Sequence, residues 1–230
     1  VMFYWCGHGL QYPTGSTKAD EQYLGMYGVV RAGLTGYDLG AMVNPSRMAS
    51  LFKPLSDRNA NLIFILDSCY SGGFVSNGTY ANGLPDNYSS TPVYGTTDTS
   101  APTHDSTIFA DSLASYFGTA GASSSTTGAA SLLKPGVWVL AAAGKDEVSW
   151  ESGTVDHGIF SYFFIDAGTS YSGTLAADWN LDGKVSLQEA YRYCQAGIQK
   201  YWNTKYAGDA RADYQFKAHL SGNPLDILIY

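Results

Sequence analysis

The chain of 230 residues has little charge and little cysteine. Only 14% of its residues are charged, the net charge is -7, and the 13 Lys and Arg residues form no cluster. We therefore do not expect a nucleic-acid partner, because surfaces that bind nucleic acids concentrate positive charge. Three cysteines do not make a disulfide framework. We expect Cys6 and Cys194 to be buried thiols, with a bridge between them as the less favoured alternative.

Long apolar runs are also missing. No run approaches the ~20 residues that a membrane-spanning helix needs, so no membrane span is expected. The composition is 45% hydrophobic, which is enough for one folded domain over residues 1–230. The sequence opens at Val1, already inside an apolar run. We expect an N-terminal complement from the same precursor, which would supply further strands to the sheet.

Basic residues are missing from one long stretch of the chain, because no Lys or Arg stands between Arg58 and Lys134. Within this interval, residues 76–106 and 118–131 are dense in Gly, Ser and Thr. Such composition is typical of exposed loops. We expect residues 76–131 to be a loop-rich insertion or linker within the domain.

The apolar runs that are present alternate with helical patterns. Residues 1–5, 62–67 and 137–143 are apolar without alternation, which predicts parallel strands buried on both faces. A fourth run, 225–230, could close an edge of the sheet. Helical patterns follow Asn44-Pro45 and occupy 108–117, 158–167 and 187–201. The fold class is therefore α/β, a three-layer sandwich with a mainly parallel central sheet flanked by helices.

A histidine and a cysteine each follow one of the predicted strands. His8 stands in Cys-Gly-His-Gly after residues 1–5, and Cys69 stands in Asp-Ser-Cys-Tyr-Ser-Gly after residues 62–67. Parallel strands place their carboxyl ends at one edge of a sheet, where ligands bind. A neighbouring imidazole can take the proton of a thiol and produce the nucleophilic thiolate. Backbone N–H groups at Gly9 and Cys69 could stabilise an oxyanion.

These two motifs resemble the catalytic motifs of the caspase-like (clan CD) cysteine peptidases, and the metacaspase and legumain-like bacterial members most. A third similarity covers Ala141-Ala142-Ala143, Val148-Ser149-Trp150-Glu151 and His157-Gly158-Ile159-Phe160-Ser161. The resemblance implies a caspase-like sandwich over most of residues 1–200. It also implies endopeptidase chemistry on protein or peptide substrates through an acyl-enzyme, with Cys69 as nucleophile and His8 as base.

The resemblance also bears on substrate choice. In basic-specific members of the family, the position of Asp67 carries an acid that lines the first specificity pocket, and Ser149, Trp150 and Glu151 form the substrate loop. We therefore expect cleavage after Lys or Arg, because an acid pairs with a basic side chain. The alternative is that Asp67 only caps nearby backbone. An enzyme of this specificity could not cut itself between residues 76 and 131.

Residues 178–189 match the loop of an EF-hand calcium site. Gly183 permits the sharp turn, and Val185 is the apolar residue that fixes the loop. The pattern predicts bound Ca²⁺, with a structural or regulatory role, and the alternative is a loop of Asx-turns without metal. The expected ligands are Asp178, Asn180, Asp182, Lys184 through its carbonyl, Ser186 through water, and Glu189.

Two further readings stay open at this point. The chain could be a catalytically silent caspase-like scaffold that serves as a calcium-binding interaction module, or a zymogen that awaits removal of an N-terminal segment. Calcium use together with the Ser, Thr, Asn and Gly content favours an extracytoplasmic location, secreted or at the cell surface.

Overall fold

The computed structural model describes residues 1–11, 22–25, 42–71, 136–144, 147–207, 215–221 and 227–230. The central sheet has the strand order β1 (Met2–Cys6), β5 (Leu62–Asp67), β6 (Val137–Ala141) and β11 (His219–Leu220). The strands β1, β5 and β6 are parallel, and β11 is antiparallel to β6. The predicted mainly parallel sheet is confirmed.

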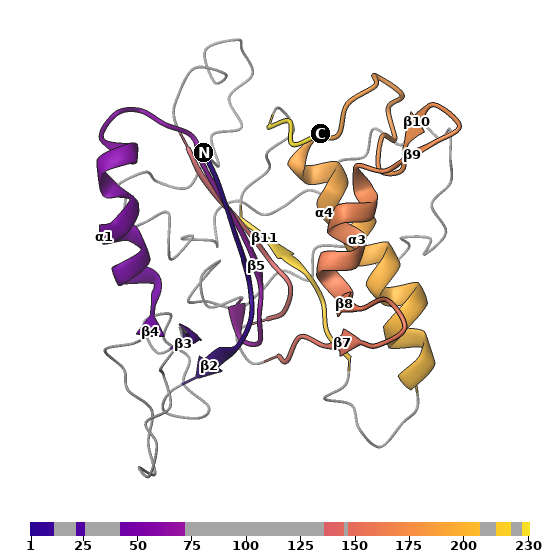
Figure 1. Ribbon diagram of the computed structural model, residues 1–230, viewed down its shortest axis with the longest axis horizontal. Coiled ribbons are helices and arrows are strands. Elements are labelled where there is room, and N and C mark those ends of the chain that lie inside the picture. The colour runs from indigo at the N-terminus through magenta and orange to yellow at the C-terminus, as the bar shows by residue number, and fades with distance from the viewer. Residues whose placement is uncertain (12–21, 26–41, 72–135, 145–146, 208–214, 222–226) are drawn as a thin grey trace.

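Helices cover both faces of this sheet, which gives three layers (Figure 1). On one face, α1 (Pro45–Ser56) packs through Met48 on Phe64 and its even-numbered neighbours in β5. On the other face, α3 (Ile159–Ala167) and α4 (Leu187–Gly197) pack on Ile63 and Ile65. Every side chain of β5 is buried, which explains why its sequence is apolar without alternation.

The helices begin where the sequence signals lie. In α1, the side chain of Asn44 accepts a hydrogen bond from the backbone N–H of Arg47 at 2.9 Å, and Pro45 opens the first turn. In α4, Ser186 and Glu189 form a reciprocal capping box. The helix continues as the π-helix η5 (Ile198–Trp202) and the 3₁₀-helix η6 (Asn203–Tyr206).

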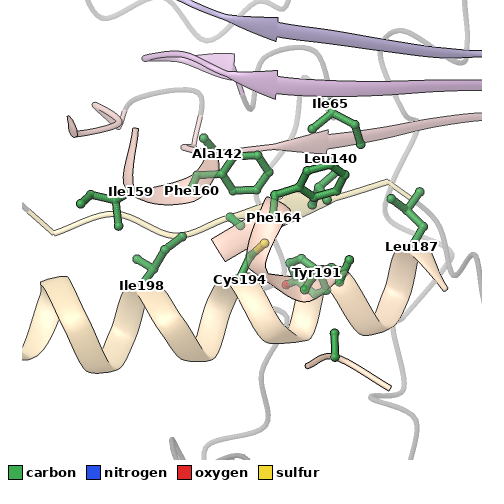
Figure 2. Close-up of a cluster of buried hydrophobic side chains, with 14 of the residues drawn as sticks. Ile65, Leu140, Ala142, Ile159, Phe160, Phe164, Leu187, Tyr191, Cys194 and Ile198 are labelled. Carbon is green, nitrogen blue, oxygen red and sulfur yellow. The ribbon is translucent and has the colours of Figure 1, made fainter. Parts of the chain in front are cut away.

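The side chains between α3, α4 and the sheet form one apolar cluster (Figure 2). Phe160 and Phe164 of α3 stack with ring centroids 6.0 Å apart, and Cys194 of α4 is completely buried among them. Burying an aromatic side chain stabilises a fold by roughly 1.5–3 kcal/mol relative to exposure. This cluster holds the beginning of α3 in place, and residues of that first turn belong to the candidate site described below.

The remaining strands are short. The segment after β1 forms an antiparallel sheet in the order β2, β3, β4, and two hairpins follow β6. The bounds are β2 (Gly9–Gln11), β3 (Gln22–Gly25), β4 (Met42–Val43), β7 (Glu151–Ser152), β8 (His157–Gly158), β9 (Ser170–Tyr171) and β10 (Thr174–Leu175).

Three expectations need correction. The edge next to β6 is closed by β11, whereas residues 227–230 lie along the loop before α4, where the backbone N–H of Ile229 donates to the carbonyl of Val185 at 2.9 Å. The side chains of Ile227 and Ile229 pack on the α3–α4 cluster instead. β1 is not buried on both faces, since Met2 and Tyr4 are exposed, and Cys6 is exposed as well. Among the described residues β1 pairs with β5 alone, so its other edge is open, while Phe3 and Trp5 are partly buried against the cluster under α1.

Some predicted features lie outside the described residues, namely the loop-rich segment 76–131, the helix 108–117 and Lys134. Among the residues that are described, none of the helices combines the length and apolar character that crossing a membrane requires. All three cysteines are free thiols, as the sequence favoured.

Candidate active site

The carboxyl ends of β1 and β5 bring the predicted catalytic residues to one edge of the sheet. The backbone N–H of Gly7 donates to the carbonyl of Asp67 at 3.1 Å. A β-carbon on Gly9 would lie 1.7 Å from the carbonyl oxygen of Cys69, so only glycine permits this approach. His8 lies between these two contacts, and its backbone is therefore fixed directly beside the Cys69 segment.

His8 and Cys69 differ in exposure. The His8 side chain is exposed, and its backbone carbonyl accepts a hydrogen bond from the N–H of Gly25 at 2.8 Å. Cys69 is partly buried, and its Sγ lies 3.7 Å from the carbonyl oxygen of Ser149.

The environment of the thiol favours its protonated form. Burial raises the pKa of Cys69 above its ordinary value, and hydrogen bonds from Ser149 oppose this shift. The nucleophile is the thiolate, so a base must take the proton when substrate binds. His8 is the titratable side chain that the glycine contacts hold beside this segment.

The residues after Cys69 form a fixed turn. Tyr70 has a left-handed φ of 58°, and its N–H donates to the carbonyl of Glu147 at 2.8 Å. The hydroxyl of Ser71 bonds to both backbone groups of Ala143. A non-glycine residue in this conformation costs free energy that the surrounding structure must offset, and such residues concentrate at functional sites.

The predicted substrate loop reaches the thiol through its first residue. Ser149 contacts Cys69 as described, and Trp150 lies next to it. The indole of Trp150 stacks on that of Trp202 in η5, with ring centroids 6.1 Å apart. Glu151 is exposed in β7, opposite Gly158 in β8. The structure therefore brings Ser149 to the thiol, anchors Trp150 on the C-terminal helices, and leaves the Glu151 carboxylate in solvent.

Asp67 is buried at the sheet edge, with 4% of its surface exposed. Its Oδ2 accepts hydrogen bonds from the backbone N–H of Ser161 at 3.1 Å and from the Ser161 hydroxyl. The N-cap residue of α3 is Gly158, which has no side chain to cap the helix. Asp67 therefore caps α3 from a distant strand. Burial raises the pKa of Asp67, and the hydrogen bonds from Ser161 oppose the rise.

Asp67 also lies within electrostatic reach of the thiol and of Glu151. The capping role that the sequence left as an alternative is thus present in the structure, supplied by tertiary contact. Capping does not remove the negative charge from the edge of the sheet. The Asp67 carboxylate therefore acts electrostatically on the Cys69 thiol.

The backbone of the loop 178–189 turns sharply. Leu181 and Gly183 adopt left-handed φ values of 59° and 81°. The carboxylate of Asp178 accepts the N–H groups of Asp182 at 3.1 Å and of Gly183 at 2.9 Å. Asn180 accepts a second hydrogen bond from the N–H of Asp182 at 2.9 Å. These hydrogen bonds bend the backbone of the loop around the side-chain oxygens of Asp178 and Asn180.

The donor set of this loop suits a hard cation, because every predicted ligand atom is oxygen. Within the described part of the chain, however, no three His, Cys, Asp or Glu side chains are gathered closely enough to hold a metal. Glu189 instead accepts hydrogen bonds from Trp179 and Ser186. The oxygen chemistry of the residues suits Ca²⁺, and calcium binding by this loop stays a prediction.

Sequence reasoning missed an ion pair next to the substrate loop. Glu147 Oε2 lies 3.5 Å from Nε2 of His219 and accepts the N–H groups of Gly144 at 2.9 Å and Lys217 at 3.1 Å. Burial raises the pKa of Glu147, but His219 and the backbone donors outweigh it and lower the pKa overall. The Glu147 carboxylate therefore links β11 to the loop that contains Glu147, and Tyr70 contacts that same loop.

The sequence also gave no role to Ser161, although it lies in the third family motif. Gly158 was the signal in the sequence that pointed to a distant cap for α3. A helix that begins after glycine has no side-chain cap of its own, so its first N–H groups need a partner from elsewhere.

Comparison with known protein families identifies the domain that contains this site. The family model described as a caspase domain matches residues 1–195. Comparisons with curated proteins and with solved structures found no match. The matched residues include both strands of the site, the substrate loop and α3, together with most of α4. The chain therefore belongs to the caspase-domain family of cysteine peptidases.

Proposed function

We propose that this chain is an endopeptidase that cleaves peptide bonds after Lys or Arg, with Cys69 as nucleophile and His8 as base. The observation that carries the proposal is the approach of Gly9 to the Cys69 carbonyl, with a β-carbon distance of 1.7 Å. No larger residue fits at position 9 without moving the backbone of Cys69. The contact keeps the backbone of His8 next to the Cys69 segment, which supports a pairing of imidazole and thiol.

The proposed reaction has two steps. His8 takes the proton of the Cys69 thiol, and the sulfur attacks the carbonyl carbon of the scissile bond. Collapse of the tetrahedral intermediate breaks the C–N bond, and His8 gives its proton to the leaving amine. Water, deprotonated by His8, then attacks the thioester and releases the acid product and the thiol. Backbone N–H groups at Gly9 and Cys69 are the proposed donors to the oxyanion.

The proposed preference for a basic residue rests on two carboxylates. Asp67 lies beside the thiol and is buried. Its charge is therefore screened less than it would be in water. Glu151 lies on the proposed substrate loop, and its exposed carboxylate would repel acidic substrates there, with more screening by water. A guanidinium or ammonium group that enters beside Cys69 would meet negative charge from both Asp67 and Glu151.

Calcium and an N-terminal complement complete the proposal. Ca²⁺ would be held by Asp178, Asn180, Asp182, the carbonyl of Lys184, Ser186 and Glu189, and would fix the start of α4. The exposure of Met2 (45%) and Tyr4 (44%) on β1 supports a further strand from the same precursor at this edge. An extracytoplasmic location, where calcium is plentiful, is consistent with such a site.

A peptidyl electrophile that carries Arg at its reactive end tests the proposal. It should label the protein once, and peptide mapping should place the label on Cys69. Cys69→Ala and His8→Ala should abolish turnover, whereas Cys6→Ala, which removes an exposed thiol, should keep the label. A silent scaffold would give no label, and a zymogen would be labelled only after proteolytic processing. Equal labelling by an electrophile ending in Asp would contradict the proposed specificity.

A further inference from the structure

Three side chains from three elements form a hydrogen-bonded chain around the buried carboxylate. The hydroxyl of Tyr4, on β1, lies 2.5 Å from Oγ of Ser161, on α3. Ser161 Oγ in turn donates to Oδ2 of Asp67, on β5. Since Ser161 has one hydroxyl proton and gives it to the carboxylate, Tyr4 must donate to Ser161. The order of donation is therefore Tyr4 to Ser161 to Asp67.

The chain fixes the orientation of the carboxylate. Oδ2 of Asp67 receives both the hydroxyl and the backbone N–H of Ser161. A β-carbon on Gly158 would lie 2.2 Å from the same oxygen, so the start of α3 packs directly on it. With one oxygen held by two donors and enclosed by backbone, the carboxylate has one orientation relative to Cys69.

We propose that Ser161, supported by Tyr4, is a positioning residue that fixes Asp67 for recognition of the basic side chain of the substrate. This inference rests on the proposed preference for Lys or Arg. Pairing between a guanidinium and a carboxylate depends on the orientation of the carboxylate, so a carboxylate that can rotate recognises Arg less well. Ser161 itself does not touch the reacting atoms.

A second consequence concerns pH. In the described part of the chain, the titratable groups around Asp67 are Tyr4 and Cys6 on β1, Cys69 after β5, Glu151 on β7 and Cys194 on α4. Burial raises the pKa of Asp67, and the Ser161 hydroxyl lowers it by stabilising the charged form. Removing that hydroxyl should raise the pKa further. The carboxyl then gains a proton at a higher pH, and binding of a basic substrate weakens there.

The test uses two peptides that differ only at the residue before the scissile bond, Arg in one and its neutral isostere citrulline in the other. Ser161→Ala should lower the ratio of kcat/KM for Arg over citrulline by about tenfold, the loss expected for a hydrogen bond to a charged group. The loss should appear in KM for the Arg peptide. Its acid limb of kcat/KM should move to higher pH, while the citrulline peptide changes little.

Matched variants separate positioning from folding. Ser161→Thr keeps the hydroxyl and should keep the ratio. Tyr4→Phe removes only the outer donor, on a half-exposed side chain, and should lower the ratio by a smaller factor. Tyr162→Phe removes a hydroxyl from the exposed side of the same helix and should change nothing. Titration with the peptidyl electrophile counts the competent sites in each preparation.

Different results overturn different statements. If the unmodified protein prefers Arg to citrulline strongly but Ser161→Ala and Tyr4→Phe keep that ratio, the positioning role is wrong and the proposed specificity stands. If Ser161→Ala weakens both peptides equally, the hydroxyl is only structural and the inference is likewise wrong. If the unmodified protein hydrolyses both peptides equally well, the preference for basic residues is wrong and the role of Ser161 falls with it.

Discussion

Gly9 approaches Cys69 so closely that a β-carbon on Gly9 would lie 1.7 Å from the Cys69 carbonyl oxygen. The two residues follow different strands, β1 and β5, so their contact joins the imidazole segment to the thiol segment. Any side chain at position 9 must push the two segments apart. The spacing between the segments of His8 and Cys69, the proposed base and nucleophile, therefore depends on the absence of a side chain at position 9.

Gly9→Ala should consequently disable the enzyme. A displacement of about 1 Å at a catalytic group can reduce the rate about 100-fold, and we expect at least this loss in kcat/KM. Gly25→Ala is the matched control, because its β-carbon would meet His8 at an ordinary 3.4 Å. Thermal unfolding of both variants shows whether Gly9→Ala remains folded. A folded Gly9→Ala protein with full activity would contradict the proposed pairing of His8 and Cys69.

The stack between Trp150 and Trp202 offers a second prediction. Trp202 is buried in η5, and its ring supports the substrate loop next to Ser149. Trp202→Leu keeps an apolar side chain but removes a stacking interaction worth about 0.5–1.5 kcal/mol beyond area burial. We expect a rise in KM of about threefold to tenfold, with a smaller change in kcat.

Trp202→Phe is the control for this effect, since it keeps an aromatic ring against Trp150. It should fall between the unmodified protein and Trp202→Leu. Equal KM values for all three proteins would mean that the loop holds its position without the stack.

The central layers of the fold are readable from sequence because their signals are local. β5 is apolar from Leu62 to Leu66 because α1 covers one face and α3 with α4 the other. The side chain of Asn44 caps the beginning of α1, and Ser186 with Glu189 caps the beginning of α4. Each cap joins residues only three positions apart in the sequence. The site is readable for a similar reason, since a motif that ends a parallel strand must lie at the ligand edge.

The parts that sequence reasoning missed depend on distant contacts. Ser161 and Asp67 are 94 positions apart, and Tyr4 and Ser161 are 157 apart, so no local pattern predicts their hydrogen bonds. β11 has only two residues, too few for a periodic pattern, whereas the longer apolar run at 225–230 attracted the edge-strand prediction. The exposure of β1 could not be read from its apolar sequence, because exposure depends on which neighbours are present.

The raised pKa of Asp67 predicts how stability depends on pH. Burial places the pKa in the folded protein above its ordinary value of 3.8, so the folded state binds a proton more readily than the unfolded state. Between the two pKa values stability therefore falls as pH rises. Asp67→Asn has no such titration. Its free energy of unfolding relative to the unmodified protein should increase as pH rises through this window and then level off.

Urea unfolding between pH 3.5 and 7 measures this difference. Ser161→Ala should extend the window to higher pH, because it removes a hydrogen bond that favours the charged form. A difference that stays constant across the whole range would mean that Asp67 titrates alike in the folded and unfolded chains.

The calcium loop can be tested without disturbing the helix that follows it. Glu189 is both the proposed closing ligand and the third residue of the capping box with Ser186. Glutamine serves equally well in a capping box but carries no charge for a cation. Glu189→Gln should therefore keep the Tm measured with chelator. It should lose most of the rise in Tm that added Ca²⁺ gives the unmodified protein.

The size of that rise follows from mass action. Calcium at 100 times its Kd stabilises the folded state by about 2.7 kcal/mol, which is several degrees in Tm for a domain of this size. Asp57→Asn, at an exposed carboxylate on the far side of the sheet, should respond to Ca²⁺ as the unmodified protein does. If the unmodified protein shows the same Tm with Ca²⁺ and with chelator, the loop binds no calcium. Its oxygens would then serve only the Asx-turns that the backbone hydrogen bonds of Asp178 and Asn180 already form.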